Sequence, residues 1–184
     1  MTERLLTKRA VTERVLPDIS EVVRCIARTL EDKIEPSLST VADRSAIVTS
    51  KHLLRYVAAR LETEGQSLLD ETKVAAKLLT DAASFLDAEG KTEAAAKMAG
   101  DIRATLAKKP DPAIYPTLAI MASEVGPLRG FIYRLLELLL ALSDEARTPA
   151  AEALHEAVRV YIGWQLQQES KYLEEPFRGH GPRR

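Results

Sequence analysis

The segment FIYRLLELLLAL, residues Phe131–Leu142, carries ten apolar or aromatic side chains among its twelve residues. Its two charged residues, Arg134 and Glu137, are three positions apart and therefore share one side of a helix. The remaining apolar surface covers well over half of the helix circumference, whereas an ordinary surface helix carries a narrower apolar stripe. The segment therefore predicts a helix that is central in its fold or buried against a partner.

The composition around this segment is that of one globular domain. The chain has 184 residues, of which 46% are hydrophobic and 29% charged, and its formal net charge is −1. A charge this close to zero offers little electrostatic attraction to phosphates, so we expect no nucleic-acid partner. The single cysteine, Cys25, excludes an intramolecular disulfide framework and is typical of a reducing compartment. A cytoplasmic protein is the expectation.

Neither a secretory signal nor a membrane span is expected. The first fifteen residues, MTERLLTKRAVTERV, are charged throughout and lack the apolar centre of a signal peptide. The apolar region 118–142 is long, but it contains Gly126-Pro127 and four charged residues, which are costly at a bilayer centre. Those charged residues are Glu124, Arg129, Arg134 and Glu137.

Helical spacing of apolar residues recurs along the chain, and no segment shows sustained period-two alternation. We therefore predict an all-α fold, an antiparallel bundle of six to seven helices without a β-sheet. Gly126-Pro127 either kinks one helix or separates two, which leaves the count open. The predicted helices span about 2–15, 18–35, 40–64, 67–89, 92–109, 118–142 and 148–175.

The predicted boundaries rest on capping residues. Asp18 and Glu21 have the spacing of a capping box, and Thr148-Pro149 has the order expected at a helix start. Gly65 and Gly90 are expected to end helices. We expect one domain over residues 1–175, with a proline-rich linker at 108–116 between front and rear helices. Residues 176–184 are expected to form a disordered tail.

No residue group carries a specific catalytic signature. Glu152 and His155 have the spacing of one metal-binding pair on a helix, but the second pair that a di-iron bundle needs is missing. Cys25 lies beside the apolar residues Val22 and Ile26, where a free cysteine usually acts as a small hydrophobe. We therefore predict no catalytic residue, no metal site and no cofactor.

A basic stripe is predicted on the helix 40–64, where Arg44, Lys51 and Arg55 recur at spacings of seven and four. Such a stripe could bind a phosphate or a carboxylate. A solvated helix face is the more common explanation, and it is the one we favour.

Aromatic residues gather late in the chain and suggest a ligand pocket. Tyr161 and Trp164 lie on the last predicted helix, and Tyr133 and Arg134 lie on the apolar helix. Packed together, these four residues could line a pocket for an acyl chain or another apolar acid, with Arg134 or Arg129 meeting the acidic group. Plain core packing or a dimer seam explains the same aromatic residues and is favoured.

The stretch TLEDKIEPSLSTVADRSAIVTSKHLLRYVAAR, residues Thr29–Arg60, resembles part of a small bacterial family of helical proteins. Members of that family tend to be encoded beside acyl-CoA dehydrogenases and aminoglycoside-phosphotransferase-like kinases. The shared features are an acidic-apolar helix end, a Pro-x-Leu stop and a long helix that begins with arginine. The resemblance implies a helical hairpin and transfers no functional residue.

These observations favour a non-catalytic accessory or scaffold protein, with self-association through helix 131–142 as a hypothesis. The alternative is a small-molecule binding protein with an aromatic-lined pocket between helices. We expect a homo-oligomer or another protein as the partner.

Overall fold

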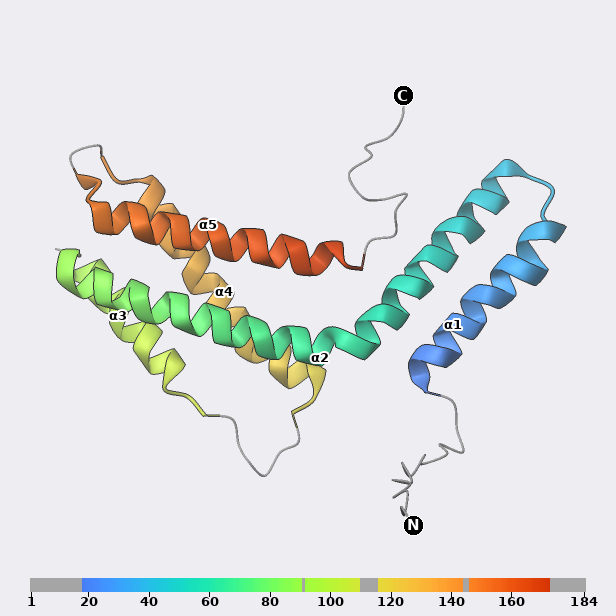
Figure 1. Cartoon of the computed structure of the whole chain (residues 1–184), viewed down its shortest axis with the longest axis horizontal. Coiled ribbons are helices and arrows are strands. Elements are labelled where there is room, and N and C mark those ends of the chain that lie inside the picture. Colours follow the sequence, from blue (N-terminus) through green and yellow to red (C-terminus); the bar gives the residue numbers. More distant parts are fainter. Residues whose placement is uncertain (1–17, 91, 110–115, 144–145, 173–184) are drawn as a thin grey trace, which may run out of the picture. The chain divides into compact units, whose positions relative to one another are not determined.

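A computed structural model describes residues 18–90, 92–109, 116–143 and 146–172. Within these ranges the chain is all-α and contains no strand (Figure 1). None of the helices described combines the length and the hydrophobicity that crossing a membrane requires. In chain order the elements are α1 (Ile19–Thr29), the π-helical turn η1 (Leu30–Ile34), the 3₁₀ turn η2 (Glu35–Ser37), α2 (Val41–Glu89), α3 (Glu93–Leu106), α4 (Leu118–Leu140) and α5 (Pro149–Ser170).

The chain divides into two compact units, and the boundary between them falls inside α2. The N-terminal unit is Met1–Ala59 and the C-terminal unit is Arg60–Arg184. The predicted helix 2–15, residues 110–115 of the predicted linker and the predicted tail 176–184 lie outside the described residues. The single domain over 1–175 therefore stays a prediction.

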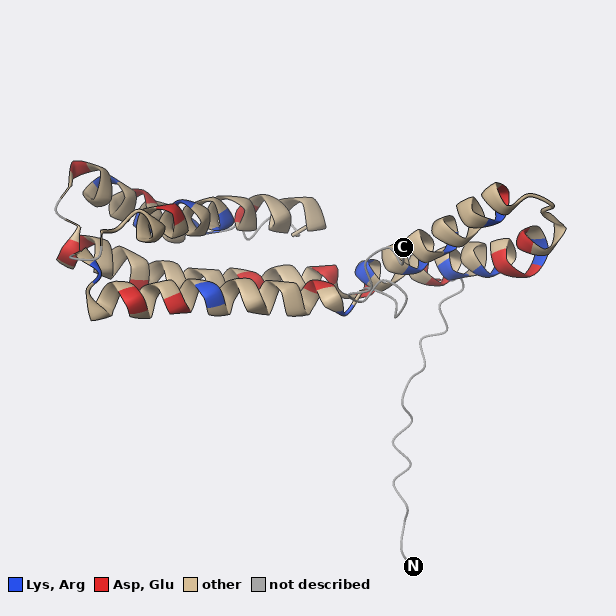
Figure 2. Cartoon of the chain, turned by 90° about the horizontal axis from the view of Figure 1, so that it is seen from above, with Lys and Arg blue, Asp and Glu red and all other residues tan. Residues whose placement is uncertain are grey.

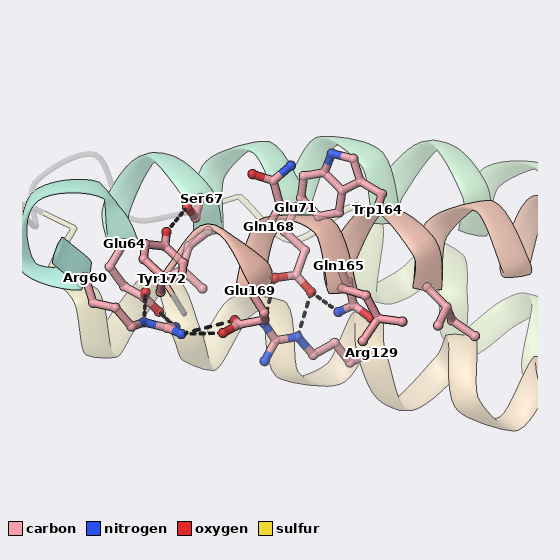
Figure 3. Close-up of a pocket in the computed structure, with 13 residues that line it drawn as sticks. Arg60, Glu64, Ser67, Glu71, Arg129, Trp164, Gln165, Gln168, Glu169 and Tyr172 are labelled. Carbon is pink, nitrogen blue, oxygen red and sulfur yellow. Dashed lines mark hydrogen bonds and ion pairs between the residues drawn. The ribbon is translucent and has the colours of Figure 1, made fainter. Parts of the chain in front are cut away.

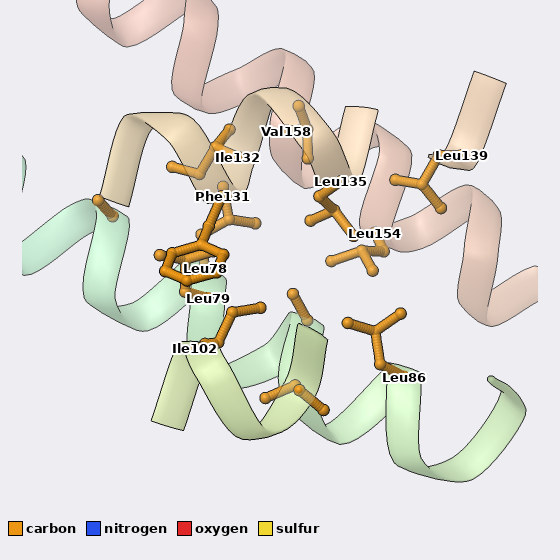
Figure 4. Close-up of a cluster of buried hydrophobic side chains, with 14 of the residues drawn as sticks. Leu78, Leu79, Leu86, Ile102, Phe131, Ile132, Leu135, Leu139, Leu154 and Val158 are labelled. Carbon is orange, nitrogen blue, oxygen red and sulfur yellow. The ribbon is translucent and has the colours of Figure 1, made fainter. Parts of the chain in front are cut away.

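The C-terminal unit packs four helical segments around one hydrophobic core (Figure 4). The apolar segment of α4 lies in this core, where Phe131, Ile132, Leu135 and Leu139 are buried. These residues meet buried side chains from the other three segments, which explains why the segment is so apolar. They include Leu78, Leu79 and Leu86 of α2, Ile102 of α3, and Leu154 and Val158 of α5. Of the two alternatives that the sequence leaves open, a helix central in its fold and one buried against a partner, the core contacts agree with the first.

Helix α4 is continuous across Gly126-Pro127, which decides between the two alternatives left open by the sequence. Pro127 lies inside the helix, so the pair does not separate two helices. Gly126 and Pro127 are both exposed, whereas their neighbours Val125 and Leu128 are buried. The burial of the flanking residues holds the two halves on one core, and this packing offsets the hydrogen bond that proline cannot donate.

Several predicted helix ends are confirmed by their capping contacts. The Glu21 carboxylate accepts a hydrogen bond from the Asp18 backbone N–H at 3.2 Å. The hydroxyls of Thr92 and Thr148 accept from the backbone N–H groups of Ala95 (3.1 Å) and Ala151 (3.2 Å). Each contact pairs a donor that the first helical turn would otherwise leave without a partner.

Gly90 ends α2 for a steric reason. A Cβ atom at this position would lie 2.2 Å from the Leu86 carbonyl oxygen and 2.6 Å from the Ala95 Cβ. The last turn of α2 and the Ala95 side chain of α3 therefore leave no room for a side chain at residue 90.

The predicted helix end at Gly65 is wrong, because α2 continues through it from Val41 to Glu89. A Cβ atom at Gly65 would lie at van der Waals distance from Met121 and Leu118 of α4. A glycine inside a helix costs only about 1 kcal/mol. Good helix-forming residues on both sides, and the buried residues that follow from Leu68 onward, are sufficient to carry the helix across. The two helices predicted over 40–64 and 67–89 are therefore one.

The N-terminal unit is a helical hairpin of α1 and the first part of α2 (Figure 1). The apolar residues Ile19, Val22 and Ile26 of α1 are exposed, with exposed fractions from 43% for Val22 to 68% for Ile19. The buried residues of α1 are instead Ser20 and Ala27. Small side chains allow close helix contact, so the hairpin is joined along the edge of the apolar stripe rather than along its centre.

The basic stripe of the hairpin is neither a solvated face nor an open phosphate site. Lys51 is buried and pairs with Glu31 at 3.2 Å and with Glu35 at 2.8 Å. Arg55 pairs with Glu31 at 2.5 Å, and the Arg44 Nε donates to the Leu38 carbonyl at 2.9 Å. The hydrogen bonds that Lys51 donates to Glu35 and Glu31 raise the pKa of Lys51. The predicted stripe therefore holds the hairpin together.

Candidate functional site

The Glu71 carboxylate of α2 is a buried polar group that binds side chains from two other helices (Figure 3). Glu71 is only 6% exposed. Both of its oxygens accept from Arg129 of α4, from Nε and from one terminal nitrogen, each at 2.6 Å. The Tyr161 hydroxyl of α5 donates to the same carboxylate at 2.8 Å, and the Gln165 amide of α5 donates at 2.7 Å. One side chain thus joins three helices.

The electrostatics of this cluster keep Glu71 ionised. Burial on its own would raise the pKa of Glu71, but the hydrogen bonds from Arg129, Tyr161 and Gln165 outweigh it and lower that pKa. Burial and the adjacent Glu71 raise the pKa of Tyr161 well above its usual range. The hydrogen bond to Glu71 raises the pKa of Arg129. The hydrogen bonds to Glu71 therefore favour its role as a link between helices over a role as a general base.

A second ion-pair group lies where α5 ends. The Arg60 guanidinium binds Glu64 at 2.5 and 2.6 Å and Glu169 at 2.8 Å. It also lies 5.1 Å from the centre of the Tyr172 ring. The Tyr172 hydroxyl is within 2.9 Å of the hydroxyls of Thr63 and Ser67. These contacts join the C-terminal end of α5 to α2.

A cavity of about 340 Å³ lies between these two groups, inside the C-terminal unit. Its apolar lining comes from Leu68, Ile162, Trp164 and Leu166, and its polar lining from Gln165, Gln168, Ser67, Tyr172 and both ion-pair groups. Three lining carboxylates face two guanidinium groups. The charge of the lining therefore favours a neutral or cationic molecule over an acid.

The structure places the four predicted ligand-binding residues in two different environments. Trp164 lines the cavity, and its ring stacks on Tyr161 with 6.4 Å between ring centres. Tyr133 and Arg134 of α4 are exposed and are absent from the cavity lining. The Arg134 guanidinium lies 4.5 Å from the centre of the Phe131 ring, and Glu137 raises the pKa of Tyr133. Tyr133 and Arg134 lie on the exposed face of α4, opposite the face that packs in the core.

Arg129, expected to meet an acidic ligand, is held by Glu71 instead. The sequence-based predictions do not include Glu71 as the partner of Arg129, although the sequence contains a signal for it. Glu71 falls in the helical row formed with Leu68, Ala75 and Leu78, which are all buried. A single carboxylate within a buried apolar row predicts a bonded partner, because an unpaired buried charge is very costly.

The other candidates for chemistry are separate from this cavity. Among the residues that the structure describes, no three His, Cys, Asp or Glu side chains form a group that could hold a metal. Glu152 and His155 lie on α5 beside a hollow lined by Leu139 and Leu142. Cys25 is exposed on α1 of the N-terminal unit, so the expectation that it packs as a small hydrophobe is wrong.

Along the helices that the structure describes, positions of basic and acidic residues alternate with one another (Figure 2). Comparison of the chain with protein-family models, with curated proteins and with solved structures finds no match. The resemblance of Thr29–Arg60 to a bacterial helical family therefore stays a prediction.

Proposed function

We propose that this chain is a non-catalytic helical accessory protein that binds through the apolar face of its N-terminal hairpin. The hairpin face consists of Ile19, Val22 and Ile26 of α1 together with Leu53 and Val57 of α2. All five are exposed, and the lowest exposed fraction among them is 43%. This exposure is the observation that carries the proposal.

The hairpin face replaces helix 131–142 as the surface for association. That helix contributes Phe131, Ile132, Leu135 and Leu139 to the core of the C-terminal unit, which leaves little of its apolar surface for a partner. In this proposal the C-terminal unit is an antiparallel bundle that keeps the chain folded, and the protein is cytoplasmic, in keeping with its single cysteine.

Dye binding tests the proposal at low micromolar protein concentration. An open apolar face increases the fluorescence of anilinonaphthalene sulfonate, and Ile26→Glu should remove most of that increase. Val160→Glu is the matched control, because Val160 is equally apolar, 63% exposed and located on α5. Circular dichroism checks that both variants stay folded. Equal dye fluorescence from Ile26→Glu and the unmodified chain would contradict the proposal.

A second candidate function is the binding of a small amphipathic molecule in the cavity beside Trp164. The supporting observation is the lining, which combines apolar side chains and an indole with a net excess of one carboxylate. Because Arg60 and Arg129 are both bound by glutamates, the expected ligand changes from an apolar acid to a neutral or cationic molecule.

Tryptophan fluorescence distinguishes these ligand classes, because Trp164 is the only tryptophan. Titration with decanol or decyltrimethylammonium should shift the emission, and decanoate at the same concentration should not. Leu166→Glu, which places a charge in the lining, should abolish the shift. If none of the three molecules changes the emission, this candidate fails.

A further inference from the structure

Helix α5 is held by the core over only part of its length. The residues of α5 that are buried in the core recur at helical spacing: Ala151, Leu154, Val158 and Tyr161. Beyond Tyr161 no described residue of the helix is buried, and the apolar Leu166 is 66% exposed. The core therefore contributes little to the segment 163–172, which we call the outer segment.

A glycine lies where the buried part of α5 ends and the outer segment begins. Gly163 is exposed, and a Cβ atom there would meet nothing within 4 Å, so no close packing requires a glycine at this position. Glycine in a helix interior is unfavourable relative to alanine, because its backbone loses more conformational freedom. The helix is therefore weakened at the junction between its two parts.

Polar contacts hold the far end of the outer segment to α2. Arg60 binds Glu169, whose side chain is more than half exposed, at 2.8 Å (Figure 3). The Tyr172 hydroxyl lies 2.9 Å from the hydroxyls of Thr63 and Ser67. Ion pairs and hydrogen bonds at the surface contribute little to stability, because water competes for both partners. These contacts can therefore open while the core stays folded.

The outer segment also contacts the Glu71 carboxylate, and this contact can open without leaving a buried charge unpaired. The Gln165 amide donates to Glu71 at 2.7 Å. When Gln165 moves away, Glu71 keeps both hydrogen bonds from Arg129 and the hydrogen bond from Tyr161. Tyr161 precedes Gly163, so it belongs to the part of α5 that the core holds in place.

The outer segment forms one wall of the cavity in the C-terminal unit. Trp164, Leu166 and Gln168 line the cavity from α5, and Ser67 and Leu68 line it from α2. A molecule in the cavity would therefore contact both the outer segment and the helix to which that segment is held.

We propose that the outer segment is a lid on this cavity, which bends at Gly163 and is latched to α2 through Glu169 and Tyr172. The inference rests on the second candidate function and describes how binding at that same site is regulated. A bound molecule stabilises the closed lid. Because such coupling is reciprocal, a variant that loosens the latch weakens binding.

Hydrogen exchange of the full chain, followed by mass spectrometry, tests the lid. Amides of residues 164–172 should exchange at least about tenfold faster than those of residues 153–161, with a step at Gly163. Ordinary fraying of a helix end would instead give a gradual increase toward residue 172. Decyltrimethylammonium should slow exchange in residues 164–172 and leave residues 153–161 unchanged.

The variant Tyr172→Phe tests the latch, because it removes the hydroxyl and keeps the ring. It should accelerate exchange of the lid about threefold, since the hydrogen bonds to Thr63 and Ser67 are lost. Tyr133→Phe is the matched control, because it removes an exposed hydroxyl that bonds Glu137 on α4, and it should leave the lid unchanged.

The variant Gly163→Ala tests the hinge. It should slow exchange of the lid about threefold, because alanine resists bending of the helix at this position. Gly100→Ala in α3, where a Cβ atom also meets nothing within 4 Å, is the matched control and should not affect the lid. Acrylamide quenching of Trp164, which lies on the lid, should decrease in Gly163→Ala and increase in Tyr172→Phe.

Uniform exchange along α5 would overturn the lid, and so would lid exchange that Tyr172→Phe or Gly163→Ala leaves unchanged. These failures are distinct from failure of the candidate function. If decyltrimethylammonium shifts Trp164 emission while the lid fails these tests, the cavity binds its ligand without a lid. If the lid moves as expected but none of the three probe molecules shifts the emission, the candidate function fails, and with it the role of the lid in binding.

Discussion

Both units of the chain contain amphipathic helices, but the apolar rows are buried in the C-terminal unit and exposed in the N-terminal unit. In the C-terminal unit, the apolar rows of four helical segments converge, and even the carboxylate within them, Glu71, is fully bonded. In the N-terminal unit, the strongest apolar row faces outward, and the contacts between helices are ion pairs and small residues. The contrast shows that an amphipathic helix does not specify what covers its apolar side. Whether that side is covered depends on how many other helices pack against it.

The largest expected effect comes from removing apolar volume in the closed core. Leu79→Ala, at a fully buried position, should lower the free energy of unfolding by about 3 kcal/mol. Leu53→Ala, which removes the same atoms from the hairpin face, should cost less than about 1 kcal/mol in the monomer. Urea denaturation followed by circular dichroism provides the measurement. Similar costs at both positions would mean that the hairpin face is enclosed.

Breaking the Glu71 cluster should have the next largest effect. Glu71→Gln leaves Arg129 without its carboxylate and should destabilise the C-terminal unit by about 2–3 kcal/mol. Asp70→Asn is the matched control, since the Asp70 carboxylate on the same helix accepts from Lys73 and Gln66 at the surface, and losing its charge should cost less than about 0.5 kcal/mol. Trp164 fluorescence during urea unfolding reports this unit. A cost for Glu71→Gln no larger than that of Asp70→Asn would contradict the role assigned to Glu71.

Two glycines of the C-terminal unit should respond to alanine with opposite signs. Gly90→Ala forces a Cβ atom against the Leu86 carbonyl and should destabilise by about 1–3 kcal/mol. At Gly163 of α5 a Cβ atom would meet nothing within 4 Å, so Gly163→Ala should stabilise by about 0.5–1 kcal/mol. Thermal unfolding distinguishes the two signs, and equal shifts would show that Gly90 does not limit the turn.

The smallest expected effect is a pH dependence that comes from Glu71 of the C-terminal unit. The pKa of Glu71 is lower in the folded chain than in the unfolded chain, so its contribution is complete above the unfolded pKa, about 4.3. That contribution is lost as the pH falls through the lower, folded pKa. The difference in unfolding free energy between the unmodified chain and Glu71→Gln should therefore narrow between pH 6 and pH 3. A constant difference would be inconsistent with an ionised Glu71.

Much of the helical pattern is predictable from local sequence. The ends at Thr92, Thr148 and Gly90 follow from capping side chains and close backbone approach, which are interactions between neighbouring residues. The end expected at Gly65 fails because packing beside α4 and good helix-forming neighbours outweigh the preference of glycine. The packing part of this explanation is a tertiary contact, which the local sequence around Gly65 does not contain.

The candidate site shows the same limit. Trp164 lies beside a cavity and stacks on Tyr161, but its predicted role in ligand binding stays a prediction. The placement of Tyr133 and Arg134 depends on how α4 is rotated, which its nearly continuous apolar circumference does not specify. The partner of Arg129 depends on three helices meeting, although the isolated carboxylate in the row of Leu68 and Ala75 indicates that some partner exists.

The contacts of Glu71 also restrict how the helices of the C-terminal unit can be assembled. Sliding α5 by one turn along α2 would carry Tyr161 and Gln165 past the carboxylate and leave a buried charge with fewer donors. An all-leucine core would tolerate that slip, because one apolar contact replaces another. A single bonded carboxylate in an otherwise uniform core thus makes misaligned packings costly, and the unit is left with one favourable register.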